Sequence, residues 1–154
     1  MEKFIQAVKS SIDKKRKTSI GTVAKITGDT CTVNRDGLPE LLDVRLNAVS
    51  GAFKNQFVVF PKIGSEVLVL EIENAPAETA IVKWTEVESV QLQIEKFEFN
   101  ADQNGLTISN QGENFKTVMN DLINEINKIL VIQGNTINRV AMDAIKDRFN
   151  KILK

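Results

Sequence analysis

Apolar residues recur with two different periods along this chain of 154 residues, and the changes of period divide it into zones. In residues 1–17, Phe4, Val8 and Ile12 stand four residues apart, which predicts one narrow apolar stripe on a helix. A helix this short is only marginally stable by itself in water. We therefore expect the N-terminal helix to dock on another surface.

Residues 18–84 change to the alternation that is typical of strands. Short strands are predicted at 21–26, 30–33, 42–46, 67–70 and 80–84, with a turn signal at Gly28-Asp29. The third strand alternates Leu42, Val44 and Leu46 with polar residues, so these three side chains are expected on its buried face. Five short strands in this zone predict a small closed barrel of the OB type, because closure removes exposed sheet edges.

Residues 85–109 are predicted to form a short extended β stub after the barrel. Five apolar residues recur at every second position but change parity midway: Val90, Leu92, Ile94, Phe97 and Phe99. The change of parity predicts a bulge or a corner near Lys96, because a regular strand keeps one buried face. One small barrel can hardly cover these side chains, so we assign them, as a hypothesis, to an oligomer interface.

Residues 110–154 return to helical spacing. Two runs of apolar residues at steps of three and four are separated by Gly134-Asn135, which predicts an antiparallel helical hairpin. The predicted fold class is therefore mainly β with α. It comprises an N-terminal helix, a small OB-type five-stranded barrel, the β stub and the C-terminal helical hairpin.

The residues needed for common kinds of catalysis are missing. Histidine is absent, which excludes Ser-His and Cys-His pairs and the common histidine-based zinc sites. Glu71 with Glu73, and Glu86 with Glu88, are more simply explained as solvated acids on strands than as an acid–base pair. The single cysteine, Cys31, is expected to be a small buried side chain on a strand. The sequence thus predicts no catalytic, metal or cofactor site, and no enzyme.

Charge and composition argue against nucleic acid as a partner. Twenty basic residues balance twenty acidic ones, whereas a phosphate-binding chain usually carries a basic excess. Tyrosine is absent, and Phe53, Phe57 and Phe60 cluster in one predicted loop rather than alternating along strands as a stacking platform would.

Two features are assigned to a partner surface instead. One is the phenylalanine cluster of Phe53, Phe57 and Phe60, which is interpreted as a partner surface or as an anchor for its own loop. The other is the basic run that ends the N-terminal helix: Lys14, Lys15, Arg16 and Lys17. Cations at a helix C-terminus also complement its dipole. A solvated helix end that contacts an acidic subunit is favoured over a contact with nucleic acid or a membrane surface.

The sequence shows no sign of export or of membrane insertion. Its first residues contain no apolar stretch of a secretory signal, and no apolar run approaches the ~20 residues that span a bilayer. We expect synthesis in the cytoplasm and no stable membrane insertion.

Three stretches of the barrel zone resemble one known family. Residues 21–23 (GTV) open the first strand, residues 60–70 read FPKIGSEVLVL, and residues 79–82 read TAIV. Together they resemble the baseplate assembly protein V family. That family includes the central spike proteins of contractile phage tails, with relatives among the valine-glycine repeat spikes of type VI secretion. The Pro-x-Ile-Gly-Ser-Glu-Val-Leu run is the distinctive part, and the rest is common to many β proteins.

The resemblance implies an OB-fold barrel in a homotrimer on the tail axis, in contact with tail tube and baseplate proteins. It implies a location in the virion after assembly in the host cytoplasm. Family members usually continue into a β-helical needle, and some end in a histidine-ligated metal tip. This chain departs from that pattern, since it has no histidine and its β stub soon gives way to helices. We therefore expect a hub or short-stub form that leaves piercing to another protein or a separate tip.

Two other functions stay open from the sequence alone. One is a different adaptor of the tail or its connector. The other is an OB-fold module that binds nucleic acid.

Overall fold

The computed structural model describes residues 2–6, 18–47, 54–73, 75–130, 134 and 136–153. Residues 2–6 are helical, in agreement with the expected N-terminal helix. The chain divides into two units, Met1–Gly51 with Pro61–Glu86, and Ala52–Phe60 with Val87–Lys154. The predicted partner residues Lys14, Lys15, Arg16, Lys17 and Phe53 lie outside the described residues.

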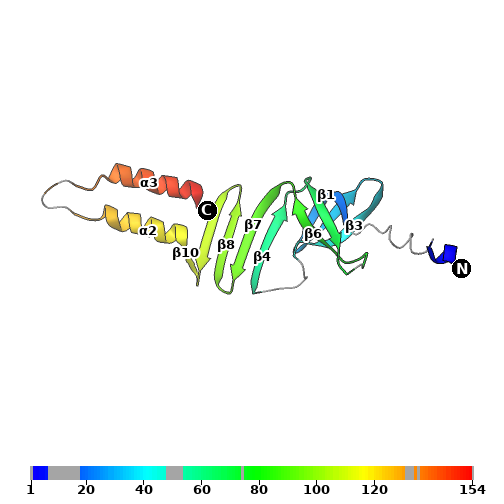
Figure 1. The fold of residues 1–154 in the computed structure, drawn as a ribbon. Coiled ribbons are helices and arrows are strands. Elements are labelled where there is room, and N and C mark those ends of the chain that lie inside the picture. The colour runs from blue at the N-terminus through cyan, green and yellow to red at the C-terminus, as the bar shows by residue number, and fades with distance from the viewer. Residues whose placement is uncertain are drawn as a thin grey trace. The chain divides into compact units, whose positions relative to one another are not determined.

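The first unit contains a closed barrel of five strands, and this confirms the predicted OB-type fold (Figure 1). The strands are β1 (Thr18–Thr27), β2 (Thr30–Arg35), β3 (Leu38–Arg45), β5 (Glu66–Glu71) and β6 (Thr79–Trp84). Their order around the barrel is β1-β2-β3-β6-β5, and β5 closes it by pairing with β1. All neighbours are antiparallel except β3 and β6, which are parallel. A meander of three strands closed by a hairpin in this way is the OB arrangement.

Small apolar side chains fill the barrel. The buried cluster consists of Val23, Cys31, Val33, Val44, Val67 and Val69. β-Branched residues pack well on a pleated surface, which explains why valine dominates here. Gly21 permits a close approach of β1 to β2, because a Cβ at this position would lie 2.5 Å from the carbonyl oxygen of Asn34. The first strand of the barrel therefore needs glycine at that point.

The expected alternation in the third strand is wrong at Leu42. Val33 pairs with Leu41 and Cys31 pairs with Val44, so β3 has one more residue than β2 between these two pairs. Within this stretch of β3, Asp43 has a φ of 54°. This is a bulge, and it places Leu41 beside the core while Leu42 is 60% exposed. The alternation in the sequence does not reveal the extra residue.

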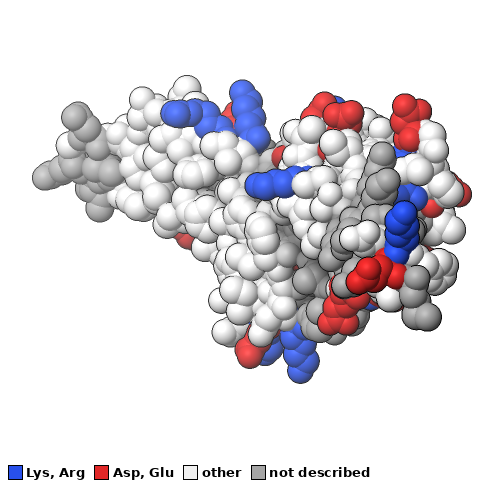
Figure 2. All heavy atoms as spheres, turned by 45° about the vertical axis from the view of Figure 1, so that its right-hand side comes forward, with Lys and Arg blue, Asp and Glu red and all other residues white. Residues whose placement is uncertain are grey.

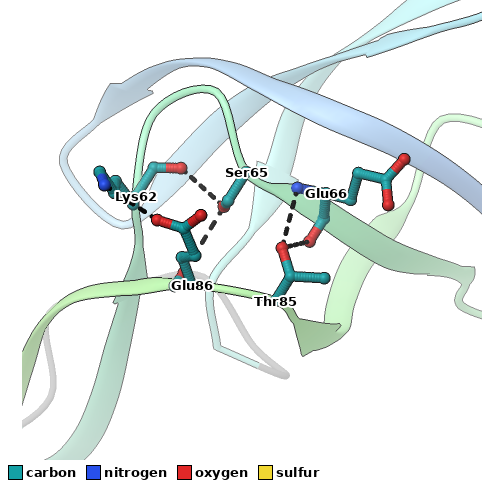
Figure 3. A network of polar contacts seen from close by, with 5 residues as sticks. All are labelled: Lys62, Ser65, Glu66, Thr85 and Glu86. Atoms are coloured by element: carbon teal, nitrogen blue, oxygen red, sulfur yellow. Dashed lines mark hydrogen bonds and ion pairs between the residues drawn. The ribbon is translucent and has the colours of Figure 1, made fainter.

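A polar network fixes the segment that enters β5 (Figure 3). The buried Ser65 donates its hydroxyl hydrogen to the carbonyl oxygen of Lys62 at 2.7 Å. The Thr85 hydroxyl accepts a hydrogen bond from the backbone N–H of Glu66 and donates one to the carbonyl oxygen of Glu66, each at 3.1 Å. The Lys62–Glu86 ion pair, at 2.9 Å, is more than half exposed on both sides and contributes little stability. The distinctive Pro-x-Ile-Gly-Ser-Glu run is therefore explained by backbone hydrogen bonds around Ser65.

The second unit contains an antiparallel sheet in the order β10-β9-β8-β7-β4. Its strands are β4 (Asn55–Pro61), β7 (Val87–Ile94), β8 (Phe97–Asp102), β9 (Gly105–Asn110) and the short β10 (Glu113–Asn114). A turn at Asn104-Gly105 joins β8 to β9, and there Asp102 accepts a hydrogen bond from the N–H of Asn104 at 2.8 Å. Strand β4 was not predicted, since residues 53–60 read as a loop.

A tight hairpin accounts for the change of parity near Lys96: of the two irregularities expected there, a bulge or a corner, the structure has a sharp turn of the chain and no bulge. Ile94 pairs directly with Phe97, and Glu95 turns the chain with a φ of 52°. The reversal of direction changes the sequence parity of the apolar residues while keeping them on one face of the sheet.

Two helices form the predicted hairpin, α2 (Phe115–Asn127) and α3 (Arg139–Ile152). The side chains of Asn114 and Asn138 cap their N-termini by accepting backbone N–H groups. The hairpin is tied to the edge of the sheet at both ends, because α2 follows β10 directly and Leu153 forms a β-bridge with Leu106. Within the described part of the chain, no helix has the length and apolar character to cross a membrane.

The thiol of Cys31 is buried in the barrel, as expected for a strand residue. Only 2% of this residue is exposed, and desolvation raises its pKa from 9.0 to about 11. The folded state therefore keeps the thiol proton to higher pH than the unfolded chain does. Unfolding releases that proton between pH 9 and 11, so this group makes the fold less stable as the pH rises through that interval.

We predict that Cys31→Ala removes this pH dependence. The free energy of unfolding of the wild type should fall relative to the variant by about 1 kcal/mol between pH 8 and 10, as the unfolded thiol ionises. Urea titrations of both proteins at each pH measure the difference, and lysine titration cancels in the comparison. A gap in stability that stays constant with pH contradicts the prediction.

Candidate assembly surface

The register of the β7-β8-β9 meander collects apolar side chains on one side of the sheet. Val90, Leu92 and Ile94 pair with Ala101, Phe99 and Phe97, while Leu106 and Ile108 pair with Ala101 and Phe99. Directly paired residues share a face. We call this set of side chains the apolar face: Val90, Leu92, Ile94, Phe97, Phe99, Ala101, Leu106 and Ile108.

The opposite side of the same strands is polar. Two rows of directly paired residues run across β7, β8 and β9 on this side. One row is Gln91, Asn100 and Thr107, and the other is Gln93, Glu98 and Ser109. A hollow of about 300 Å³ on this side is also lined by Gln56 of β4. Side chains alternate along a strand, so Phe57, next to Gln56, extends the apolar face across β4.

The apolar face is poorly covered within one chain. Ile94 is 50% exposed and Phe57 60%, while the other members of the face are half-buried. Among the described residues of the second unit, the buried hydrophobic side chains are Val58, Ile123 and Leu153, and none belongs to this face. Apolar surface of this extent on one side of a sheet is typical of an interaction site.

Charge is also absent from this face, since all eight of its members and Phe57 are uncharged. In the view of Figure 2, charged side chains crowd the barrel, whereas the visible side of the sheet and helices is largely white, with fewer charges. An uncharged apolar surface is complementary to another copy of itself, because no like charges are brought together.

The structure places the predicted interface residues together. Val90, Leu92, Ile94, Phe97 and Phe99 all lie on the apolar face. Of the predicted partner residues, Phe57 lies on the same side of the sheet. Phe60 is half-buried and has the parity of Gln56, so these two phenylalanines do not form one cluster.

Sequence reasoning missed three members of the face: Ala101, Leu106 and Ile108. Leu106 and Ile108 alternate with polar residues directly after the Asn-Gly turn. That turn signal predicts a hairpin, and pairing the two strands across it would have placed Leu106 and Ile108 opposite Ala101 and Phe99.

A metal site finds no candidate ligands among the described residues. They contain no cluster of three or more His, Cys, Asp or Glu side chains that could hold a metal ion. Of the acids considered above, Glu86 pairs with Lys62. A barrel pocket of about 170 Å³ includes Arg35, whose guanidinium donates Nε and Nη2 hydrogens to the carbonyl oxygen of Pro39 at 3.0 and 2.7 Å.

Comparison with models of known protein families, with curated proteins and with solved structures found no match for this chain.

We predict that the chain associates through the apolar face and that Leu92→Asp breaks this association. A carboxylate at the centre of a buried apolar interface is costly to desolvate, so the dissociation constant should rise at least about 100-fold. The matched control is Gln91→Asp, which adds the same charge one residue away on the polar face. Sedimentation velocity over a dilution series measures both, with circular dichroism to check the fold. Equal behaviour of the two variants would contradict the assignment of the faces.

Proposed function

We propose that this chain is a structural, non-enzymatic subunit of a phage or phage-like tail baseplate. In this proposal it forms a homotrimeric hub or central spike on the tail axis and joins the tail tube to the tip. The observation that carries the proposal is the chain order: an OB-type barrel is followed directly by a β meander whose apolar face is only partly covered.

The barrel and the sheet have different roles in this proposal. The barrel has its own buried core, so it is a complete small fold in a single chain. The sheet has one apolar and one polar side, so it needs a second layer on the apolar side. Three copies around a three-fold axis supply that layer to one another, and each polar side then faces outward.

The proposal of three copies is based on the resemblance of the barrel sequence to the baseplate assembly protein V family. The proposal that copies associate at all is based on the apolar face. Fully burying a Leu, Ile, Val or Phe side chain contributes about 1.5–3 kcal/mol, and the side chains of this face, which are partly exposed in one chain, can still gain a fraction of that energy. Several such side chains per copy are enough to offset an association cost of about 4–15 kcal/mol.

Nucleic-acid binding is supported less well. In OB folds, bases stack on aromatic rings beside a basic groove. Residues 18–47, which form the first three strands, contain no Phe, Tyr or Trp, and the chain as a whole has no net charge.

Immunogold electron microscopy tests the proposed location. Tail particles induced from the source organism are labelled with antibody raised against this chain, and pre-absorbed antibody serves as the control. Label at one end of the tails, opposite the head, is the expected result. Label at the head–tail junction would identify a connector adaptor instead, and particles without label would overturn the proposal. Salt-sensitive retention of the chain on single-stranded DNA would favour the nucleic-acid module.

A further inference from the structure

The hairpin of α2 and α3 is joined along a polar seam. Three side-chain hydrogen bonds cross it: Asn120 Nδ2 to Asn150 Oδ1 at 3.2 Å, Lys146 Nζ to Asn124 Oδ1 at 2.9 Å, and Asn127 Nδ2 to Asp143 Oδ1 at 3.0 Å. Hydrogen bonds of this kind contribute about 1 kcal/mol each. The Oδ1 atoms of Asn120 and Asn127 are buried without a partner among the described residues, which costs stability.

Each helix carries an apolar stripe on the side away from the seam. Residues two positions apart lie about 200° apart around a helix, so a stripe offset by two residues from the seam lies nearly opposite to it. On α2 and just beyond its end, Val118, Leu122 and Ile129 are 47%, 51% and 55% exposed. On α3, Ile145 and Ile152 are 39% and 57% exposed.

The two stripes point to opposite sides of the hairpin, because the seam lies between the helices. They therefore cannot cover one another within one chain. Most helical hairpins bury their apolar stripes against each other, with polar residues outside. In this hairpin much of the apolar surface faces outward, so it needs partners on two sides.

One charged residue interrupts each stripe. Glu125 follows Leu122 by three residues on α2, and Arg148 follows Ile145 by three residues on α3. The hydrogen bonds of the seam give the positions of these two residues along the length of the hairpin. Glu125 lies next to the Asn124–Lys146 contact, and Arg148 lies between that contact and the Asn120–Asn150 contact. The two charges are thus within about one helical turn of each other along the hairpin, on opposite outer sides.

We infer that the α2 stripe of one copy packs against the α3 stripe of the next copy, with Glu125 beside the neighbour's Arg148. This inference rests on the proposed homo-oligomer and names a second interface within it. Pairing of like stripes would place Glu125 against Glu125, or Arg148 against Arg148, and both arrangements repel. The contact is therefore heterologous, and copies related by a rotation axis close it into a ring.

The charge pattern identifies a second copy as the partner. The two stripes have similar apolar spacing and carry opposite charges within about one helical turn of each other along the hairpin, and both belong to the same chain. Glu125 contacts Lys128 of its own helix, but both side chains are more than two-thirds exposed, and such pairs are worth little. Glu125 can therefore give up its ion pair with Lys128 and contact the neighbour's Arg148 at little cost in free energy.

Cysteine cross-linking tests the geometry directly. The double variant Glu125→Cys with Arg148→Cys carries both halves of the contact, whereas each single variant carries one. Under mild oxidation the double variant should give covalent dimers and trimers on a denaturing gel, and the single variants only monomers. Cys31 is buried and does not interfere. Cross-linked single variants would show that like stripes meet, and an uncross-linked double variant would overturn the contact.

A charge exchange separates this inference from the proposed function. Glu125→Arg and Arg148→Glu should each raise the dissociation constant about tenfold, and the double exchange should restore it to within about threefold. Asp147→Arg, a reversal next to Arg148 but off the stripe, is the control and should have little effect. If the dissociation constant of the oligomer is the same in both single exchanges and in the double exchange as in the wild type, only this inference is contradicted. A wild-type protein that stays monomeric overturns the inference together with the proposed trimer.

Discussion

An antiparallel sheet with one apolar face must cover that face, and the rest of this molecule can be understood from that constraint. The barrel satisfies the same requirement internally, because closure turns its apolar sides toward one another around Val33 and Val44. The open sheet cannot do this. Its register places eight apolar side chains on one side. The segments that follow β9, namely β10 and the bridge at Leu153, pair with the edge of the sheet and do not form a layer over that side.

The helical hairpin shows the same deficit in another form. Its polar seam joins the helices by three modest hydrogen bonds, and Ile123 is buried, but Val118, Leu122, Ile145 and Ile152 remain exposed on the outer sides. Packing of amphipathic faces normally supplies most of the stability of such helices. In the proposed assembly, further copies of the chain would cover the exposed apolar side chains of both the sheet and the hairpin.

Much of the fold could be predicted from periodicity. The five barrel strands and both helices of the hairpin follow from spacing alone, because each has a regular pattern and clear turn signals. Strand β4 was missed because its neighbourhood has a Gly and clustered phenylalanines instead of alternation. Leu42 was misplaced because a single bulged residue at Asp43 leaves no mark in the sequence.

The candidate surface was predictable in composition but not in geometry. The five residues from Val90 to Phe99 were identified because they alternate, although the change of parity left open whether a bulge or a corner separates them. Only pairing between strands shows that Leu106 and Ile108 join them, since that information is not local. The outward stripes of the hairpin could not be predicted either, because amphipathic spacing does not say which side faces the neighbouring helix.

The mass of the native protein in solution tests the central claim most directly. Light scattering coupled to size exclusion, at micromolar concentration and at both low and high salt, gives that mass. Burial of the apolar face between three copies predicts about three times the 17.2 kDa of one chain, unchanged by salt because the face carries no charge. A mass of 17.2 kDa under the same conditions would show that the face stays open in a monomer, and would contradict the account.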